Sequence, residues 1–255
     1  MDKEIACMFQ DKAVVITGAG RSIGRTLALG FAAQGAIVLA HYGHARQGAE
    51  EVVRQINEQG GKAFLAGADL SHPEEVTKLV EEAHQLLGPI DVWINNAGAS
   101  ANSAETRGMS EIEIFERMMG VDVLGTWRCC REAEPYMRDG GSILTTGWDR
   151  ALDGAAGLPN QMYAMSKGAI MSLTRCLAAE FAPRVRVNCI APGRIENEWA
   201  QTLSEASRQQ AAQQVPLQRW GTPEDILNTA LFLSSSSASF MTGQVLLVNG
   251  GEIMR

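Results

Sequence analysis

Tyr163 and Lys167 are the two residues whose types and spacing most directly suggest chemistry in this sequence of 255 residues. On a helix, residues four apart lie on one face, so the phenol and the ammonium would be neighbours one turn apart. A free tyrosine titrates near pH ~10 and a nearby cation favours the phenolate, so we expect the pKa of Tyr163 to be lowered toward neutrality. Such a group can give a proton to a carbonyl oxygen or take one from an alcohol.

A glycine-rich segment near the start of the chain predicts a nucleotide site. Residues 13–17 are apolar and mostly β-branched, as in a buried strand, and residues 18–24, Gly-Ala-Gly-Arg-Ser-Ile-Gly, precede a helical pattern over residues 25–34. Glycines let the backbone approach a pyrophosphate, and the start of the following helix offers free N–H groups. The alternative for this segment alone is a tight turn that binds no ligand.

A second strand signal lies at residues 90–94 and ends in Asn95-Asn96-Ala97-Gly98. Small and amide residues at that place suit the carboxyl end of a parallel strand, where such sheets bind ligands.

Together these motifs resemble those of the short-chain dehydrogenase/reductase family, in its common single-domain form. The resemblance covers nearly the whole chain, and its motifs are Thr17 to Gly24, Asp69, residues 95–98, Tyr163 with Lys167, residues 186–188 before Pro192-Gly193, and residues 248–251. It implies hydride transfer between a nicotinamide cofactor and a carbonyl, an alcohol or an activated double bond.

The resemblance also implies which residues bind the cofactor and which are catalytic. Lys167 would hold the nicotinamide ribose as well as act on Tyr163, and Ser22 stands where the family has its middle glycine. The implied cofactor-binding residues are Gly18, Gly20, Arg21, Ser22, Ile23, Gly24, Tyr42, Asp69, Leu70, Asn96, Ala97, Gly98, Tyr163, Lys167, Pro192, Gly193 and Ile195.

The end of the predicted second strand bears on the choice of cofactor. An NAD site places an acid about 20 residues beyond the glycine loop to hold the ribose 2′-hydroxyl, but this position is Tyr42. Arg21 lies in the loop where NADP-preferring relatives carry a basic residue, and His44 or Arg46 could add donors to a 2′-phosphate. NADP(H) is therefore favoured over NAD(H). Alternatively, Arg21 merely pairs with a surface acid.

The catalytic half departs from the family pattern. The family's Ser at the end of the fifth strand has no counterpart: counting forward along the strand reaches Trp148, counting back from Tyr163 reaches Arg150, and Asp149 lies between them. The family's helix Asn, which supports a proton-carrying water near the Lys, aligns with Asp122. We therefore include Asp149 and Asp122 among the catalytic candidates.

Asp149 leaves three interpretations open. It takes the place of the Ser, as an Asp does in pteridine reductases; or it pairs with Arg150 or another cation while Tyr163 works alone; or the chain is a catalytically weak NADP(H)-binding sensor or partner protein. A pterin-type reductase is less favoured because residues 99–102 lack the aromatic that would stack a pterin.

Composition narrows the functional class. The hydrophobic content of 45% and charged content of 20% are ordinary for a globular protein, and the net charge of −7 gives no basic surface for nucleic acid. Five cysteines without metal-ligand spacing indicate reduced thiols and no metal site. With neither a signal peptide nor an apolar run of about 18 residues, we expect a cytoplasmic protein with no membrane contact.

The pattern of the elements predicts an α/β fold of the Rossmann type: one domain over residues 1–255, with a doubly wound, seven-stranded parallel sheet and helices on both faces. Ser71 with Glu74, and Ser110 with Glu113, predict capping boxes at two helix starts. Residues 195–218 are expected to form a lid over a small carbonyl or alcohol substrate, with Trp148 and Trp199 as walls. The family resemblance implies a homotetramer. The predicted strands are residues 13–17, 36–40, 63–67, 92–95, 142–146, 185–190 and 245–248.

Overall fold

The computed structural model describes residues 7–101 and 106–254, apart from the side chain of residue 199. Within them, seven parallel strands form one sheet in the order β3-β2-β1-β4-β5-β6-β7. The predicted doubly wound sheet is confirmed, since the order reverses between β1 and β4, where such sheets bind ligands. The strands are β1 Ala13–Ile16, β2 Ile37–Tyr42, β3 Lys62–Gly67, β4 Ile90–Asn95, β5 Met137–Thr146, β6 Val185–Pro192 and β7 Val245–Val248.

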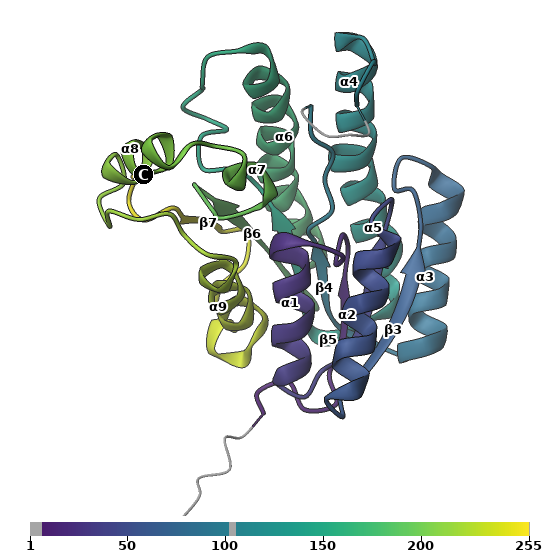
Figure 1. The fold of residues 1–255 in the computed structure, drawn as a ribbon. Coiled ribbons are helices and arrows are strands. Elements are labelled where there is room, and N and C mark those ends of the chain that lie inside the picture. The colour runs from purple at the N-terminus through teal and green to yellow at the C-terminus, as the bar shows by residue number, and fades with distance from the viewer. Residues whose placement is uncertain (1–6, 102–105, 255) are drawn as a thin grey trace, which may run out of the picture.

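Helices cover both faces of the sheet (Figure 1). Successive strand residues point to opposite faces, so Val14 and Ile16 of β1 pack with α1, α2 and α9, whereas Val15 packs with α3, α5 and α6. The helices are α1 Ser22–Ala33, α2 Arg46–Glu58, α3 Pro73–Leu87, α4 Glu111–Met118, α5 Thr126–Ala133, α6 Leu158–Phe181, α7 Glu198–Gln201, α8 Glu205–Gln213 and α9 Pro223–Ser234, with short 3₁₀ turns at Glu134–Tyr136 and Ser236–Ala238.

The predicted strands differ from the observed ones by at most two residues at either end, except at the start of β5. β5 ends at Thr146 as predicted, but it begins at Met137 rather than Ser142, because Met137 pairs with Ile90 ahead of an irregularity in the register. The carboxyl ends carry the loops that could bind a ligand, so this difference lies away from the site.

One of the two capping boxes was predicted wrongly. The box of Ser110 and Glu113 is present at the start of α4. Ser71 does not cap α3, whose cap position is His72 without a side-chain cap. Instead, the Ser71 hydroxyl donates to the carboxylate of Asp69 at 2.7 Å, and this neighbour removes it from the helix start.

A π-helical turn joins α4 to α5. It spans Met119–Gly125, and the backbone stays helical on both sides, so residues 111–133 form one continuous helix. A π turn is a local widening that is frequent at functional sites. Asp122 lies in its middle and is fully buried.

Among the described residues, no helix is both long enough and apolar enough to cross a lipid bilayer. All five cysteines are unpaired: Cys129, Cys130 and Cys189 are buried, whereas Cys7 and Cys176 are exposed.

Candidate functional site

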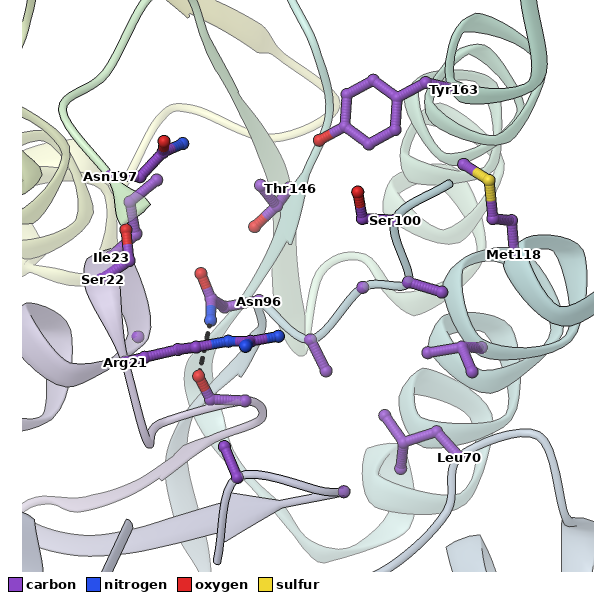
Figure 2. A pocket seen from close by; sticks show the side chains of 18 of the residues that line it. Arg21, Ser22, Ile23, Leu70, Asn96, Ser100, Met118, Thr146, Tyr163 and Asn197 are labelled. Carbon is purple, nitrogen blue, oxygen red and sulfur yellow. Dashed lines mark hydrogen bonds between the residues drawn. The ribbon is translucent and has the colours of Figure 1, made fainter. Parts of the chain in front are cut away.

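A cavity of about 570 Å³ lies at the carboxyl ends of the strands, within the usual size range of ligand sites (Figure 2). All of the residues predicted to bind the cofactor line it. Asp122 and Asp149 do not line it. The lining residues that were predicted are Gly18, Gly20, Arg21, Ser22, Ile23, Gly24, Tyr42, Asp69, Leu70, Asn96, Ala97, Gly98, Tyr163, Lys167, Pro192, Gly193 and Ile195.

The glycine loop is packed too tightly for side chains. A Cβ on Gly24 would lie 2.0 Å from the carbonyl oxygen of Gly18, and a Cβ on Gly18, whose φ is +67°, would lie 2.9 Å from the Cα of Ala97. Asn96 closes the loop by donating to the Gly18 oxygen at 3.1 Å. Ser22 has a φ of +46°, a left-handed value that explains why relatives carry glycine at that position.

His41 supports the same loop and was missed by the sequence analysis. Its Nδ1 accepts from the backbone N–H of Gly18 at 3.2 Å, so its Nε2 carries the hydrogen and donates to the Ala68 oxygen at 2.9 Å. Burial lowers the pKa of His41 to about 4, which keeps the ring neutral and both bonds intact at physiological pH. The only sequence signal was a histidine inside an apolar strand.

Arg117 fixes the next part of the cavity wall and was also missed. Its guanidinium donates to both oxygens of Asp69, at 2.9 and 2.7 Å. Burial alone would raise the pKa of Asp69, but the hydrogen bonds from Ser71 and Arg117 lower it to about 2. Asp69 is therefore an oriented carboxylate, available to amino or hydroxyl groups of a ligand.

The basic residues proposed for a 2′-phosphate separate in the structure. Arg21 and His44 line the cavity, whereas Arg46 does not and instead pairs with Glu50 at 2.7 Å. Arg21 lies 3.6 Å from the carboxylate of Glu198 on α7. Both of these side chains are more than half exposed, so the pair is weak and a phosphate could replace the acid.

Tyr163 and Lys167 share one face of α6, and the Lys167 Nζ lies 5.4 Å from the centre of the Tyr163 ring. Asp122 meets the ammonium at 3.1 Å, in a pair that is almost completely buried. The backbone N–H of Ala99 donates to the other Asp122 oxygen at 2.7 Å, and the Ser166 hydroxyl lies 3.3 Å from the first. These contacts orient the Asp122 carboxylate beside the Lys167 ammonium.

The expected lowering of the pKa of Tyr163 is wrong. Burial raises the pKa of Tyr163; Lys167 lowers it, but Asp122 and Asp149 raise it further. The pKa of Lys167 is lowered by burial and raised by Asp122, with a net rise. The expectation considered the Lys167 ammonium alone, but the buried Asp122 carboxylate beside it offsets part of its effect on the pKa of Tyr163.

Trp148 occupies the part of the wall where the family's Ser was sought. Its ring packs edge-on against that of Tyr163, with centroids 5.2 Å apart and planes at 62°. Ser100 also lines the cavity, and in Figure 2 its hydroxyl points towards the side of the cavity where Tyr163 lies. Ser100 was not predicted, and it gives the site a hydroxyl from the loop after β4. The other wall residue proposed, Trp199, has no described side chain, and Asn102 lies outside the described residues.

Asp149 contacts the segment that follows β7. One carboxylate oxygen accepts from Asn249 at 3.2 Å, and the other is buried with no hydrogen-bond partner among the described atoms. Burial raises the pKa of Asp149, and the bond from Asn249 lowers it in part. The Arg150 guanidinium donates to Glu252, and its charge also lowers the pKa of Asp149.

The residues present fit a dinucleotide cofactor. In the glycine loop of residues 18–24, which we call the glycine cradle, Gly18, Gly20 and Gly24 have no room for a Cβ. Asp69 is an oriented acceptor, and the Gly20–Arg21 turn precedes the start of α1. Backbone N–H groups at a helix start bind phosphate oxygens, and a buried phenol beside an ammonium can move a proton. The cavity can therefore hold a nucleotide at one end and perform proton transfer at the other.

Comparisons with known proteins agree with this geometry. A family model described as enoyl-(acyl carrier protein) reductase matches residues 18–252. The chain is 35% identical over 249 residues to 3-oxoacyl-(acyl-carrier-protein) reductase FabG of Staphylococcus epidermidis, covering 96% of this chain and 100% of that protein. A short-chain dehydrogenase/reductase structure from Brucella melitensis has a TM-score of 0.88 at 32% identity, covering 97% of this chain and 99% of that one. A blue fluorescent protein from a metagenomic library, in complex with NADPH, has a TM-score of 0.88 at 30% identity, covering 97% of this chain and 100% of that one.

Proposed function

The chain belongs to the short-chain dehydrogenase/reductase family, and from that premise we propose that it is an NADP(H)-dependent reductase of small ketones. The observation that carries the proposal is that the glycine cradle and the Tyr163 phenol open on one cavity. A nucleotide seated on the cradle extends along the carboxyl ends of the strands, towards the end of the cavity that Tyr163 lines.

Two observations support NADP(H) over NAD(H). The end of β2 carries Tyr42 instead of an acid, and Arg21 lines the cavity with only a weak, exposed partner. The similar structure from a metagenomic library was solved with NADPH. A 2′-phosphate would meet Arg21 in charge-assisted hydrogen bonds and displace Glu198 from it.

Tyr163 moves the proton in the proposed mechanism. When bound, the nicotinamide supplies or accepts the hydride. The Tyr163 hydroxyl gives its proton to the substrate oxygen in reduction and recovers it in alcohol oxidation. Burial raises the pKa of Tyr163, so the phenol stays protonated at neutral pH and holds the proton that reduction requires, although it is a weaker acid than a free phenol.

Lys167 and Asp122 act around that phenol. Lys167 would hold the nicotinamide ribose, as the family resemblance implies, and its buried pair with Asp122 fixes the ammonium near Tyr163. The Ser100 hydroxyl lines the cavity and could give the substrate oxygen a second hydrogen bond, in place of the Ser that this chain lacks. Asp149 does not line the cavity, so its neutral carboxyl would have to turn from Asn249 to serve as that donor.

The substrate class follows from the wall opposite the nucleotide. Trp148 and Met118 line it, so the space beside Tyr163 is partly apolar and suits a ketone with an apolar neighbour. The similar staphylococcal protein is named for a 3-oxoacyl thioester substrate. Residues 195–218, which contain α7 and α8 and place Ile195 in the cavity wall, form the lid in this proposal. Since Asp149 faces Asn249, the structure favours this substrate over a pterin.

We also propose a cytoplasmic homotetramer. Five unpaired cysteines suit a reducing compartment. Leu124 and Trp127 stand 45% and 43% exposed, and Met165 on α6 is 51% exposed, which leaves apolar surface for a second copy to cover. Light scattering at micromolar concentration should give a mass well above 27.5 kDa; a mass near that of one chain would contradict this assembly.

Thermal melting with nucleotides tests the cofactor. NADPH should raise the melting temperature more than NADH at equal concentration, because a ligand that binds only the folded protein stabilises it by mass action. Arg21→Ala should narrow that difference. Arg46→Ala is the matched control, since Arg46 does not line the cavity and should leave it unchanged. Equal shifts for the two nucleotides would sink the assignment.

Turnover tests the reaction class. A panel of 3-oxoacyl thioesters, simple ketones, imines, alcohols and a dihydropterin should show NADPH oxidation with the ketones first. If none of these substrates reacts with either nucleotide although NADPH binds, the sensor interpretation becomes the better one.

A further inference from the structure

Glu252 is an acid with little access to water, and it is held by two arginines from different loops. Its side chain is 5% exposed. Arg194, in the loop after β6, donates from Nε to both carboxylate oxygens at 2.9 and 3.1 Å, and Arg150, in the loop after β5, donates to one of them. A carboxylate removed from water requires such partners, so this cluster is bound together strongly.

Both arginines lie next to residues of the cavity wall. Arg150 follows two residues after Trp148, the ring that packs against Tyr163. Arg194 stands between Gly193 and Ile195, which both line the cavity. The loops that carry the aromatic wall and the start of segment 195–218 are therefore anchored on one carboxylate.

The same cluster reaches the far end of segment 195–218. The second guanidinium nitrogen of Arg194 donates to the Gln214 side chain at 3.2 Å, just after α8. The backbone N–H of Leu217 donates to the Gly250 oxygen at 3.1 Å. In Figure 1, α8 lies beside the described end of the chain.

The loop after β6 packs tightly against the segment after β7. The N–H of Gly193 donates to the Val248 oxygen at 3.0 Å, and a Cβ on Gly193 would lie 2.5 Å from the Cβ of Asn249. Residues 248–252 therefore pack directly against the loop after β6, and Glu252 adds charge-assisted bonds to that packing.

We propose that Glu252 is a positioning residue that fixes the substrate end of the cavity by holding the loops of Arg150 and Arg194 together. Without its charge, two guanidinium groups share one weak acceptor and repel each other, so the loops separate. The glycine loop follows β1, on the other side of the point where the strand order reverses, and among the described residues no hydrogen bond or ion pair joins it to Glu252, Arg150 or Arg194. The inference rests on the proposed function for its effect on substrate binding, but its effect on the loops does not depend on turnover.

Glu252→Gln is the direct test, and Glu134→Gln is its control. Glu134 pairs with Arg184, and both side chains are partly buried. The pair lies near the starts of β5 and β6, at the ends of these strands opposite the cavity. In Glu252→Gln, the KM for the ketone should rise at least tenfold with a smaller change in kcat. The NADPH-induced shift in melting temperature should change less, because the glycine loop keeps its contacts and only Gly193 and Ile195 adjoin Arg194. Glu134→Gln should lower the melting temperature and leave the KM unchanged.

Trypsin cleavage after Arg208, on α8, gives a readout that needs no substrate. Cleavage should be at least fivefold faster in Glu252→Gln than in the wild-type protein or in Glu134→Gln, and Glu252→Asp should fall between. If Glu252→Gln does not fold, Glu252→Asp is judged by the same comparison. Wild-type cleavage rates and KM in the Glu252 variants, or equal changes in Glu134→Gln, would overturn the proposal. Absence of turnover with every substrate would instead count against the proposed function, and the cleavage rates would still decide this inference.

Discussion

Around the glycine loop the cavity wall is made mostly of backbone and small residues, whereas around Tyr163 it is made of larger side chains from several loops. In the first region, Gly18, Asn96 and His41 fix one another through hydrogen bonds to main-chain atoms. In the second, Trp148 meets Tyr163 while Asp149 reaches Asn249, a hundred residues further on. A wall made of closely packed backbone tolerates few substitutions, whereas a wall made of side chains can acquire different functional groups by substitution. The departures from the family's catalytic pattern are concentrated in the second region.

The largest difference between the two regions is expected at Tyr163, where removing one oxygen atom should stop catalysis and leave nucleotide binding intact. Tyr163→Phe should lower kcat/KM for ketone reduction by at least about 10³-fold, because it removes the general acid. NADPH binding, measured by fluorescence titration, should survive within a few fold. Substantial activity in the variant would mean that another group moves the proton.

Asp149 and Ser100 sharpen the question of the second donor. Asp149→Ala should lower reduction by about 10²-fold with little effect on NADPH binding if the carboxyl donates to the substrate oxygen. Asp149→Ser should keep or raise carbonyl reduction, since it restores the family's hydroxyl. If Asp149→Ala is harmless and Ser100→Ala shows the loss instead, the donor is Ser100.

Asp122→Asn tests the electrostatics of the same region. The Asp122 carboxylate raises the pKa of Tyr163, so its removal should lower that pKa and increase the phenolate fraction at a given pH. Alcohol oxidation, which needs the base, should then rise roughly threefold to tenfold at pH 8, and its pH profile should move to lower pH. Reduction at pH 6 should change less. An unmoved oxidation profile would show that Asp122 does not act on the phenol.

The smallest effect is expected at Ser22, in the backbone region. Ser22→Gly should raise the melting temperature by about 2 to 4 °C, because glycine relieves about 1 kcal/mol of left-handed strain in a chain of this size. Ser22→Ala keeps the strain and removes only the hydroxyl, so it should not be stabilised. A loss of NADPH affinity in both variants would instead assign the hydroxyl a phosphate contact.

The same division explains how far the sequence could be interpreted. The sheet was predicted correctly, and every residue predicted to bind the cofactor lines the cavity, because glycine turns and apolar strands are local signals that fix backbone positions. The raised pKa of Tyr163 was not foreseen, because it depends on the burial of the phenol and on the Asp122 carboxylate beside Lys167, which only the folded chain reveals. The pairs of Arg117 with Asp69 and of Arg150 with Glu252 were missed for a related reason. Their members are 48 and 102 residues apart, and nothing in the sequence around an arginine indicates which distant acid it will meet.

The π turn at residues 119–125 constrains the length of the chain as well as its composition. A π turn holds one more residue than the α-helix it interrupts, so a deletion within it would let residues 111–133 relax to a regular helix. Each residue of an α-helix advances by about 100°, and one side of the deletion would rotate by that amount against the other. Asp122 would leave the ammonium it meets, or Cys129 and Cys130 would leave the core. Insertions and deletions should therefore be far rarer here in natural variants than substitutions.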